Sequence, residues 1–225
     1  MTKVESAAAS DRNQEDKGTK QSRDPAMTQA RILRAAKAEF AKEGFGGARV
    51  ESIALRAKAN KRLIYHYFES KEKLFLAVLE DAWLDIRTAE KRLELDHLPP
   101  REAIITLMTH TWNYYLKHPE FLALANNENL HRARHVKKSA IFSELHQDFV
   151  GMLKRILDRG VEEGSFRPGI DPVQLHISMA AVGYYYLTNQ YTGRVIYGFD
   201  FSDKTALDAR LSFNIDSIMR ILAPD

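Results

Sequence analysis

Apolar residues recur at steps of three and four along most of this chain, a spacing that is typical of amphipathic helices. No segment shows the strict alternation of apolar and polar residues that indicates a strand. Proline, glycine and capping residues separate the amphipathic segments. We therefore predict an all-α fold of about nine helices. They are expected at about residues 25–44, 50–57, 61–68, 71–95, 101–117, 120–134, 139–163, 172–197 and 202–222.

The first 24 residues differ from the rest because they contain almost no apolar side chains. Such a composition cannot offset the entropy that is lost on ordering, so we predict a disordered tail over residues 1–24. The apolar pattern begins at residue 25. We expect a small three-helix domain at 25–72 and a larger helical domain at 73–225.

Residues 49–74 hold two short amphipathic segments on either side of a tight break at 57–60. The second segment carries polar and basic side chains on its outward side, and Asn60 is placed as its N-cap. This arrangement is typical of a helix-turn-helix, in which one helix supports and the other enters the DNA major groove. Lys61 and Arg62 stand where base edges come within reach, and both can donate to guanine O6 and N7. The alternative is a structural helix pair with an exposed basic face.

Positive charge is concentrated in the same part of the chain. Residues 25–75 contain eleven Lys and Arg residues against five acidic residues, whereas the whole chain has a net charge of +3. A locally basic segment on a nearly neutral protein is the footprint expected for contact with a phosphate backbone. A basic helix surface that is merely solvated would give the same count.

Composition narrows the cellular setting. The chain contains no cysteine, which excludes disulfides and thiolate metal sites and favours a reducing compartment. We find no apolar run long enough to span a bilayer and no secretory signal. We therefore expect a soluble, cytoplasmic protein with no membrane partner.

Residues about 28–75 resemble the N-terminal DNA-binding domain of the TetR family of transcriptional regulators. The matching stretches are ILRAAKAEFAKEGF and VESIALRAKANKRLIYHYFESKEKL, in which Tyr-x-Tyr-Phe followed by Ser-Lys-Glu-x-Leu is the specific element. The resemblance implies a ligand-responsive regulator, most often a repressor, that binds double-stranded operator DNA. The DNA-binding residues that we predict are Arg49, Glu51, Asn60, Lys61, Arg62, Leu63, Tyr65, His66, Tyr67 and Lys71.

This stretch departs from the family pattern at two places. The turn usually holds a glycine where this chain has Lys58, so Lys58 is expected to take a left-handed conformation at a cost of about 1 kcal/mol. The supporting helix usually starts with Ser or Thr, where this chain has Ala48 and Arg49. Arg49 is expected to replace the hydroxyl contact to phosphate. Both departures leave the operator sequence unpredictable.

The C-terminal two-thirds resembles the family only in its layout, which implies a homodimer whose interface is a four-helix bundle of the two last long helices. An apolar stripe supports this interpretation independently. Two-fold symmetry would then require a near-palindromic operator. The alternative is a stripe that is buried within its own monomer. The stripe consists of Leu207, Leu211, Ile215, Ile218 and Leu222.

The middle helices offer aromatic walls with a few amides, a mixture that suits a small planar or aromatic effector. The alternative is that these aromatics belong to the core. The pocket residues that we predict are Trp112, Tyr115, Phe121, Asn126, Asn127, Phe149, Met152, Tyr185, Tyr186 and Asn189. Residues 117–134 and 213–222 also weakly resemble the RutR-like subgroup, which responds to pyrimidines.

Other chemistries find less support in the sequence. Glu128, His131 and His135 share one helix face and could bind zinc or nickel, but neighbouring basic residues oppose a cation and favour a solvated or capping cluster. We see no glycine-rich phosphate loop, no nucleophile–base motif and no carboxylate dyad. We therefore expect no metal, no cofactor and no enzymatic activity. An architectural DNA-binding protein without effector, or a helical small-molecule enzyme, are the alternatives to a regulator.

Overall fold

The computed structural model describes residues 24–224, and it contains helices and loops but no strand within that range. This confirms the all-α prediction. The α-helices are α1 (Pro25–Gly47), α2 (Val50–Arg56), α3 (Lys61–Phe68), α4 (Lys71–Lys91), α5 (Pro100–Lys117), α6 (Pro119–Leu130), α7 (Ile141–Glu162), α8 (Pro172–Thr188), α9 (Gln190–Tyr197) and α10 (Lys204–Leu222). Two short 3₁₀ helices, η1 (Leu95–His97) and η2 (Val136–Lys138), complete the list. The tail predicted at 1–24 lies outside the described residues except for Asp24.

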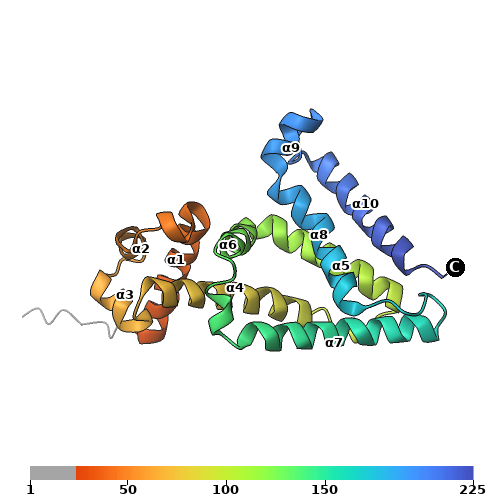
Figure 1. The fold of residues 1–225 in the computed structure, drawn as a ribbon, viewed down its shortest axis with the longest axis horizontal. Helices are drawn as coiled ribbons and strands as arrows, with labels where there is room; N and C mark the ends of the chain where they lie inside the picture. The colour runs from red at the N-terminus through yellow and green to blue at the C-terminus, as the bar shows by residue number, and fades with distance from the viewer. Residues whose placement is uncertain (1–23, 225) are drawn as a thin grey trace, which may run out of the picture.

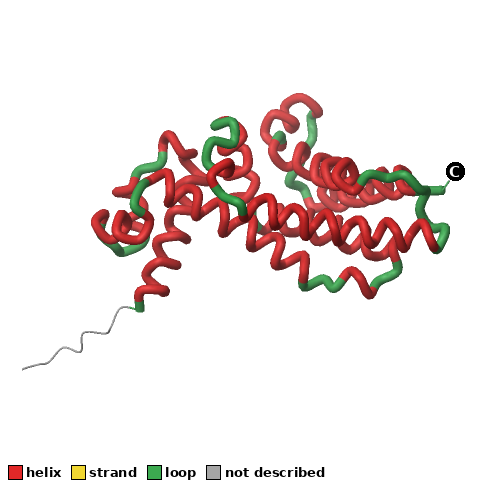
Figure 2. The backbone as a smooth tube through the Cα atoms, turned by 60° about the horizontal axis from the view of Figure 1, so that its bottom comes forward, coloured by secondary structure: helices red, strands yellow, loops and turns green. Residues whose placement is uncertain are grey.

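The helices form an elongated molecule with α1–α3 at one end and α8–α10 toward the other (Figure 1). Helix α4 leads from the small end into the larger body, where it packs against α7. Helix α1 packs against both α4 and α6, so the small end is attached to the body along two helices. Figure 2 shows that loops are confined to connections between helices.

Two clusters of buried apolar side chains hold this arrangement together. The first joins α1–α4 to parts of α5 and α6 and includes Phe40, Phe75 and Leu79. The second lies among α5, α7, α8 and α10 and includes Leu107 and Ile156. The first cluster spans the boundary between the predicted domains at 72 and 73, because α4 belongs to both sides of it. That boundary stays a prediction.

Capping residues start the helices where the sequence predicts. The Asn60 side chain accepts from the Leu63 amide at 2.8 Å, and the Ser70 hydroxyl accepts from the Lys73 amide at 3.1 Å. Each contact satisfies a backbone donor that a helix N-terminus leaves free. Asp24, which we assigned to the tail, instead accepts from the Ala26 amide at 2.9 Å and caps α1.

Three predicted helices end or break earlier than their apolar pattern suggests. Helix α4 ends at Lys91 instead of about 95, and α6 ends at Leu130 instead of about 134. The helix predicted at 172–197 breaks at Asn189, whose side chain donates to the Tyr185 carbonyl at 2.9 Å. A polar side chain that bonds the preceding turn competes with the helical backbone, which explains the break.

Candidate nucleic-acid interface and inner groove

Polar side chains of α1 brace both ends of α2. Arg31 Nε donates to the Ala57 carbonyl at 2.6 Å, and the buried Glu39 carboxylate accepts from the Arg49 amide at 3.3 Å. Lys58 has a φ of 47°, which confirms the predicted left-handed conformation. Sequence reasoning missed Arg31 and Glu39. Glu39 stands next to Phe40 on the apolar side of the first helix, and that position was the available signal.

Helix α3 separates a buried face from an exposed face. Ile64 and Phe68 are buried against the first cluster, and this orientation fixes which residues point outward. Leu63 and Tyr67 are partly buried and pack against the same cluster, so packing occupies much of their surface. The exposed predicted contacts on α3 are Lys61, Arg62, Tyr65 and His66. Their spacing places them on one side of the helix, as a surface that enters a groove requires.

Glu51 and Lys61 form an ion pair across the two helices. A side-chain hydrogen bond from Lys61 holds the pKa of Glu51 below its usual value. Lys61 therefore shares its charge with Glu51 when no DNA is bound. Arg62 has no acidic partner within residues 24–224, so its guanidinium is the freer of the two predicted base-reading groups.

Lys71 begins α4 and lies between α3 and the body of the molecule. Its Nζ is 4.9 Å from the centroid of the Phe45 ring, and the residue is partly buried. A cation over an aromatic face is held in place while its polar end stays hydrated. The contact leaves the Lys71 ammonium at the first turn of a helix, where an anion such as phosphate is also favoured.

The junction between the small end and the body is built around Asn127. Asn127 Oδ1 accepts from the Phe45 amide at 3.0 Å, across α6 and α1. Gly44 has a φ of 67°, and a Cβ at this position would lie 2.5 Å from Asn127 Nδ2. Only glycine satisfies both conditions. Asn127, which we predicted in the effector pocket, connects α6 to α1 and does not line the groove described below.

Glu128 and His135 extend this junction as a buried brace. Glu128 accepts from the backbone amides of His135 at 2.7 Å and Val136 at 3.1 Å, and its other oxygen lies 2.7 Å from His135 Nδ1. The His135 ring packs at 4.7 Å from Phe45, which belongs to α1. These bonds draw the chain back after α6 and explain its early end. They also engage both Glu128 oxygens, and residues 24–224 hold no group of three acidic or histidine residues suited to a metal.

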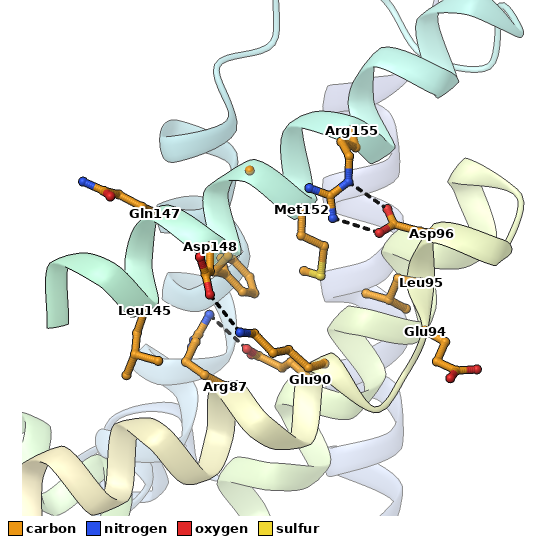
Figure 3. Close-up of a pocket in the computed structure, with 13 residues that line it drawn as sticks. Arg87, Glu90, Glu94, Leu95, Asp96, Leu145, Gln147, Asp148, Met152 and Arg155 are labelled. Carbon is orange, nitrogen blue, oxygen red and sulfur yellow. Dashed lines mark hydrogen bonds and ion pairs between the residues drawn. The ribbon is translucent and has the colours of Figure 1, made fainter. Parts of the chain in front are cut away.

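A groove of about 520 Å³ lies between α4, the turn at 92–96 and α7 (Figure 3). Two exposed ion pairs cross its outer part: Lys91 to Asp148 at 2.8 Å, and Arg155 to Asp96 at 2.8 Å. Met152, a predicted pocket residue, also lines the groove. The groove volume falls within the range of about 300–1,000 Å³ that is typical of small-molecule sites.

The inner end of the groove is formed by Arg87, Glu90 and Phe149. Glu90 is only 2% exposed, and Arg87 Nη1 lies 3.0 Å from Glu90 Oε2 without making a hydrogen bond. Burial raises the pKa of Glu90 to about 7, although Arg87 opposes the rise. The Arg87 guanidinium also lies 4.0 Å from the centroid of the Phe149 ring.

The same three residues form one wall of a smaller cavity between α5 and α8. Tyr115 and His176 lie on its other walls, and the His176 ring is 4.4 Å from that of Phe149. Burial lowers the pKa of His176 to about 4, with Arg87 and His146 acting in the same direction. His176 is therefore a neutral ring at pH 7.

The structure brings together only part of the predicted effector pocket. Trp112, Tyr115, Phe149 and Met152 line the groove or the cavities behind it. The other predicted residues lie elsewhere: Phe121 packs in the first cluster, Asn126 bonds to Tyr184, Asn127 serves the junction, Tyr185 is exposed, Tyr186 stacks on Phe201, and Asn189 breaks a helix.

Sequence reasoning missed the charged residues at the inner end of the groove. Glu90 follows Ala82 and Ile86 at four-residue steps, so a carboxylate continues the apolar row of α4. A charged residue at an apolar position of the helix could have indicated a buried polar site at Glu90 and at Arg87, which lies one turn before it. His176 stands in an apolar helix without a comparable sign.

The predicted dimerisation stripe faces the interior of its own chain. Ile218 and Leu222 are fully buried in the second cluster, and Leu207, Leu211 and Ile215 pack against the two clusters. Ile218 and Leu222 are thus buried within the protomer, whereas Leu207, Leu211 and Ile215 are only partly buried, and the part of the stripe in a dimer stays a prediction. Helix α10 packs on α5 and α8 through this stripe. Phe213, which is 62% exposed, lies on the opposite, outward face of the helix.

The molecule is all-α, with a braced helix-turn-helix at one end and a groove in its larger helical body. These features are typical of a DNA-binding transcriptional regulator. Comparison with known proteins identifies the family. Residues 32–78 match the model of bacterial regulatory proteins of the tetR family, and residues 100–218 match that of the tetracyclin repressor-like C-terminal domain. The chain belongs to the TetR family of transcriptional regulators.

Relatives support this assignment over most of the chain. The HTH-type transcriptional repressor NicS of Pseudomonas putida is 39% identical over 193 residues, which cover 86% of this chain and 91% of NicS. The HTH-type transcriptional repressor SCO4008 of Streptomyces coelicolor is 42% identical over 102 residues, 45% of this chain and 50% of that protein. RutR of Escherichia coli is 43% identical, but only over 68 residues, 29% of this chain and 32% of RutR.

Solved structures agree in fold. The transcriptional regulator SCO4942 of Streptomyces coelicolor superposes with a TM-score of 0.67 at 24% identity, over 88% of this chain and 99% of that one. A regulatory protein of the same family from Rhodococcus gives 0.69 at 16% identity, over 88% and 98%. Within the described residues, no helix combines the length and apolar character needed to cross a bilayer.

Proposed function

We propose that this chain is a cytoplasmic, homodimeric repressor that binds a near-palindromic operator and is released from it by a small-molecule effector. The observation that carries the proposal is the exposed face of α3, where Lys61, Arg62, Tyr65 and His66 project away from the buried Ile64 and Phe68. Its similarity to NicS and SCO4008, both HTH-type transcriptional repressors, favours repression.

Within the operator, Arg62 is the group best suited to read bases. Its guanidinium is free of acidic partners in the described chain and can donate two parallel hydrogen bonds to guanine. Lys61 would join it after leaving Glu51. Lys71 and Arg49 stand at the starts of flanking helices, where contacts to phosphate position the protein without reading sequence.

The dimer interface that we propose uses the outward faces of α8 and α10 in place of the predicted stripe. Ile177 and Tyr185 on α8, and Phe213 and Ile221 on α10, are all exposed apolar side chains. Helices α8 and α10 pack together, so two copies can form a four-helix contact from these faces. Val195, 83% exposed on the neighbouring α9, would extend the contact.

The release mechanism follows from α4. Its first turn carries Lys71 beside the DNA-binding helices, while its last turns carry Arg87 and Glu90 at the inner groove. An effector that binds one position of α4 better than another shifts the population of the two. The separation of the two α3 helices in the dimer would change, and they would no longer match successive major grooves.

The test is a footprint on the intergenic DNA beside the chain's own gene, followed by a titration against excess random DNA. We expect a protected near-palindrome and binding that survives the competitor. Light scattering of the same protein should give the mass of a dimer. Binding that random DNA abolishes would instead identify an architectural protein, and a monomer bound to one half-site would contradict the dimer.

A further inference from the structure

We propose that the inner end of the groove binds a neutral, planar heterocycle whose edge carries an N–H donor next to a carbonyl acceptor. The N–H would donate to Glu90 and the carbonyl would accept from Arg87, with the ring against Phe149. This inference rests on the proposed effector response, and it names the chemistry of the effector. The three residues lie together at the inner end of the groove, as Figure 3 shows for Arg87 and Glu90.

The first argument is the unsatisfied acceptor. Glu90 is 2% exposed, and its Oε2 has no hydrogen-bond partner within the described residues. A buried carboxylate oxygen without a donor is unfavourable, and native structures rarely tolerate one without a functional reason. A ligand N–H would supply the missing donor. The raised pKa of Glu90 has the same origin, because burial without hydrogen bonds disfavours the charged form.

The second argument is the donor beside it. Arg87 carries five N–H groups on a flat guanidinium, and its one ion pair in the described chain is with Glu90. Its guanidinium carbon lies 4.0 Å from the centroid of the Phe149 ring, a cation–π contact that holds the group beside the groove. A carbonyl oxygen on the ligand can therefore accept from Arg87 while the adjacent N–H reaches Glu90. An acceptor and a donor side by side are complementary to this pair.

Charge and shape restrict the ligand further. A cationic ligand would lie against Arg87, and an anionic ligand would lie against Glu90, so a neutral edge is preferred. His176 behind Phe149 is also held neutral, by burial and by Arg87. Phe149 lines the groove beside the pair and offers an apolar ring to the ligand, while His176 packs against Phe149 from behind at 4.4 Å.

The position of the pair also provides a path into the protein. Arg87, Glu90 and Phe149 separate the open groove from the smaller cavity that Tyr115 and Met179 line. A ligand that engages Arg87 and Glu90 would loosen this partition and displace α4, on which both residues stand. Binding of the ligand and the proposed shift of α4 would then be directly coupled.

The test uses 2-pyridone, the simplest aromatic ring with an N–H beside a carbonyl. N-methyl-2-pyridone is the matched control, because it keeps the ring and the carbonyl and lacks only the donor. Ligand-observed NMR titration with the full chain should show saturable binding of 2-pyridone and at least about tenfold weaker binding of the methylated ring. Equal binding of the two compounds, or no binding of either, would overturn the proposal.

Two variants locate the site. Replacing the pair by apolar residues of similar volume, Arg87→Met with Glu90→Met, removes both polar partners, and such replacements of buried pairs commonly leave folding intact. We expect this double variant to lose 2-pyridone binding. Lys154→Met removes an exposed charge on α7 outside the groove, and this variant should bind as the unchanged protein does. Binding that survives the double variant would place the site elsewhere and refute the assignment.

Operator binding by the same proteins separates this inference from the proposed function. Sequence-selective DNA binding together with silent 2-pyridone titrations would overturn the ligand class and leave the regulator standing. Selective 2-pyridone binding with no operator in any footprint would support the site and overturn the proposed function.

Discussion

Glu51 and Glu90 lie in the two candidate sites of this molecule, and their surroundings shift the pKa values of the two carboxyl groups in opposite directions. Glu51 lies exposed at the DNA-binding end, where a hydrogen bond from Lys61 holds its pKa below the usual value. Glu90 lies buried at the inner groove, where desolvation outweighs Arg87 and raises its pKa to about 7. Both face a basic partner, so burial and not the partner decides the direction of the shift.

The comparison extends to how each region is encoded. The DNA-binding surface comes from one continuous stretch, in which the register of α3 alone exposes Lys61, Arg62, Tyr65 and His66. The inner end of the groove joins Arg87 of α4 to Phe149 of α7, and the cavity behind them adds His176 of α8, so these residues meet only after the helices have packed. Water screens charges on the first surface, whereas the second surface holds its charges away from water.

The largest expected effect is on the free energy of unfolding, and it distinguishes the buried face of α10 from its exposed face. Leu222→Ala removes a fully buried side chain and should lower the free energy of unfolding by about 2–5 kcal/mol in chemical denaturation. Phe213→Asp, on the outward face of the same helix, should leave the unfolding of the protomer nearly unchanged but dissociate the proposed dimer in light scattering. A stable Leu222→Ala dimer beside an unfolded Phe213→Asp protein would reverse our assignment of the two faces.

The second prediction tests the buried carboxylate through pH. Because the pKa of Glu90 is raised from 4.5 to about 7 on folding, the folded state holds this proton more tightly. Its contribution to stability is therefore complete below pH 4.5 and is lost as the pH rises through 7. The unfolding free energy of the unchanged protein, minus that of Glu90→Gln, should fall by up to about 3 kcal/mol between pH 4.5 and 8.

Subtracting the unfolding free energy of Glu90→Gln from that of the unchanged protein cancels the contribution of His176, which changes with pH in the opposite direction. Its pKa is lowered to about 4, so its stabilisation is present above pH 6.5 and lost as the pH falls toward 4 in both proteins. Glu94→Gln, an exposed neighbour in the same groove, serves as the matched control and should show no such fall. A difference that stays flat across this range would show that Glu90 is not buried as described.

The sequence predicts the DNA-binding end better than the C-terminal region, because the former depends on local contacts and the latter on distant ones. The helix-turn-helix, the N-caps at Asn60 and Ser70 and the left-handed Lys58 depend on neighbours within a few residues, and the structure confirms them. The direction in which α10 faces depends on α5 and α8, far away in the chain, and an apolar stripe looks the same in a core and in an interface.

The groove was predicted only in part, through Phe149 and Met152, for a related reason. Aromatic residues drew the prediction toward Phe121 and Tyr186, which pack in the core, because a ring alone does not reveal whether a cavity lies beside it. The informative residues were charged ones at apolar positions. Glu90 interrupts the apolar row of α4, and Glu39 does the same in α1. Glu39 accepts from the Arg49 amide and Glu90 lies beside the groove, and periodicity alone can specify neither environment.

At the DNA-binding end, Arg62→Ala and Lys71→Ala should weaken operator binding in different ways. Loss of Arg62 should cost about 1–3 kcal/mol and relax the preference at one base position. Loss of Lys71 should weaken binding to all sequences alike and reduce the salt slope by about 1. Fluorescence anisotropy with the operator and with single-base variants, each at several salt concentrations, measures both. Unchanged binding by both variants would remove these residues from the interface.

The smallest expected effect belongs to Glu51, the exposed counterpart of Glu90. Glu51→Gln releases Lys61 from its ion pair and removes a negative charge that faces the phosphates, so operator affinity should rise, within about fivefold because water and salt screen exposed charges. Asp158→Asn disrupts a comparable exposed pair with Lys154 on α7 and should leave affinity unchanged. The gain should shrink as salt is added. A loss of affinity in Glu51→Gln would mean that Glu51 contacts DNA directly, as the family resemblance implies, and that its pairing with Lys61 orders the interface instead of competing with it.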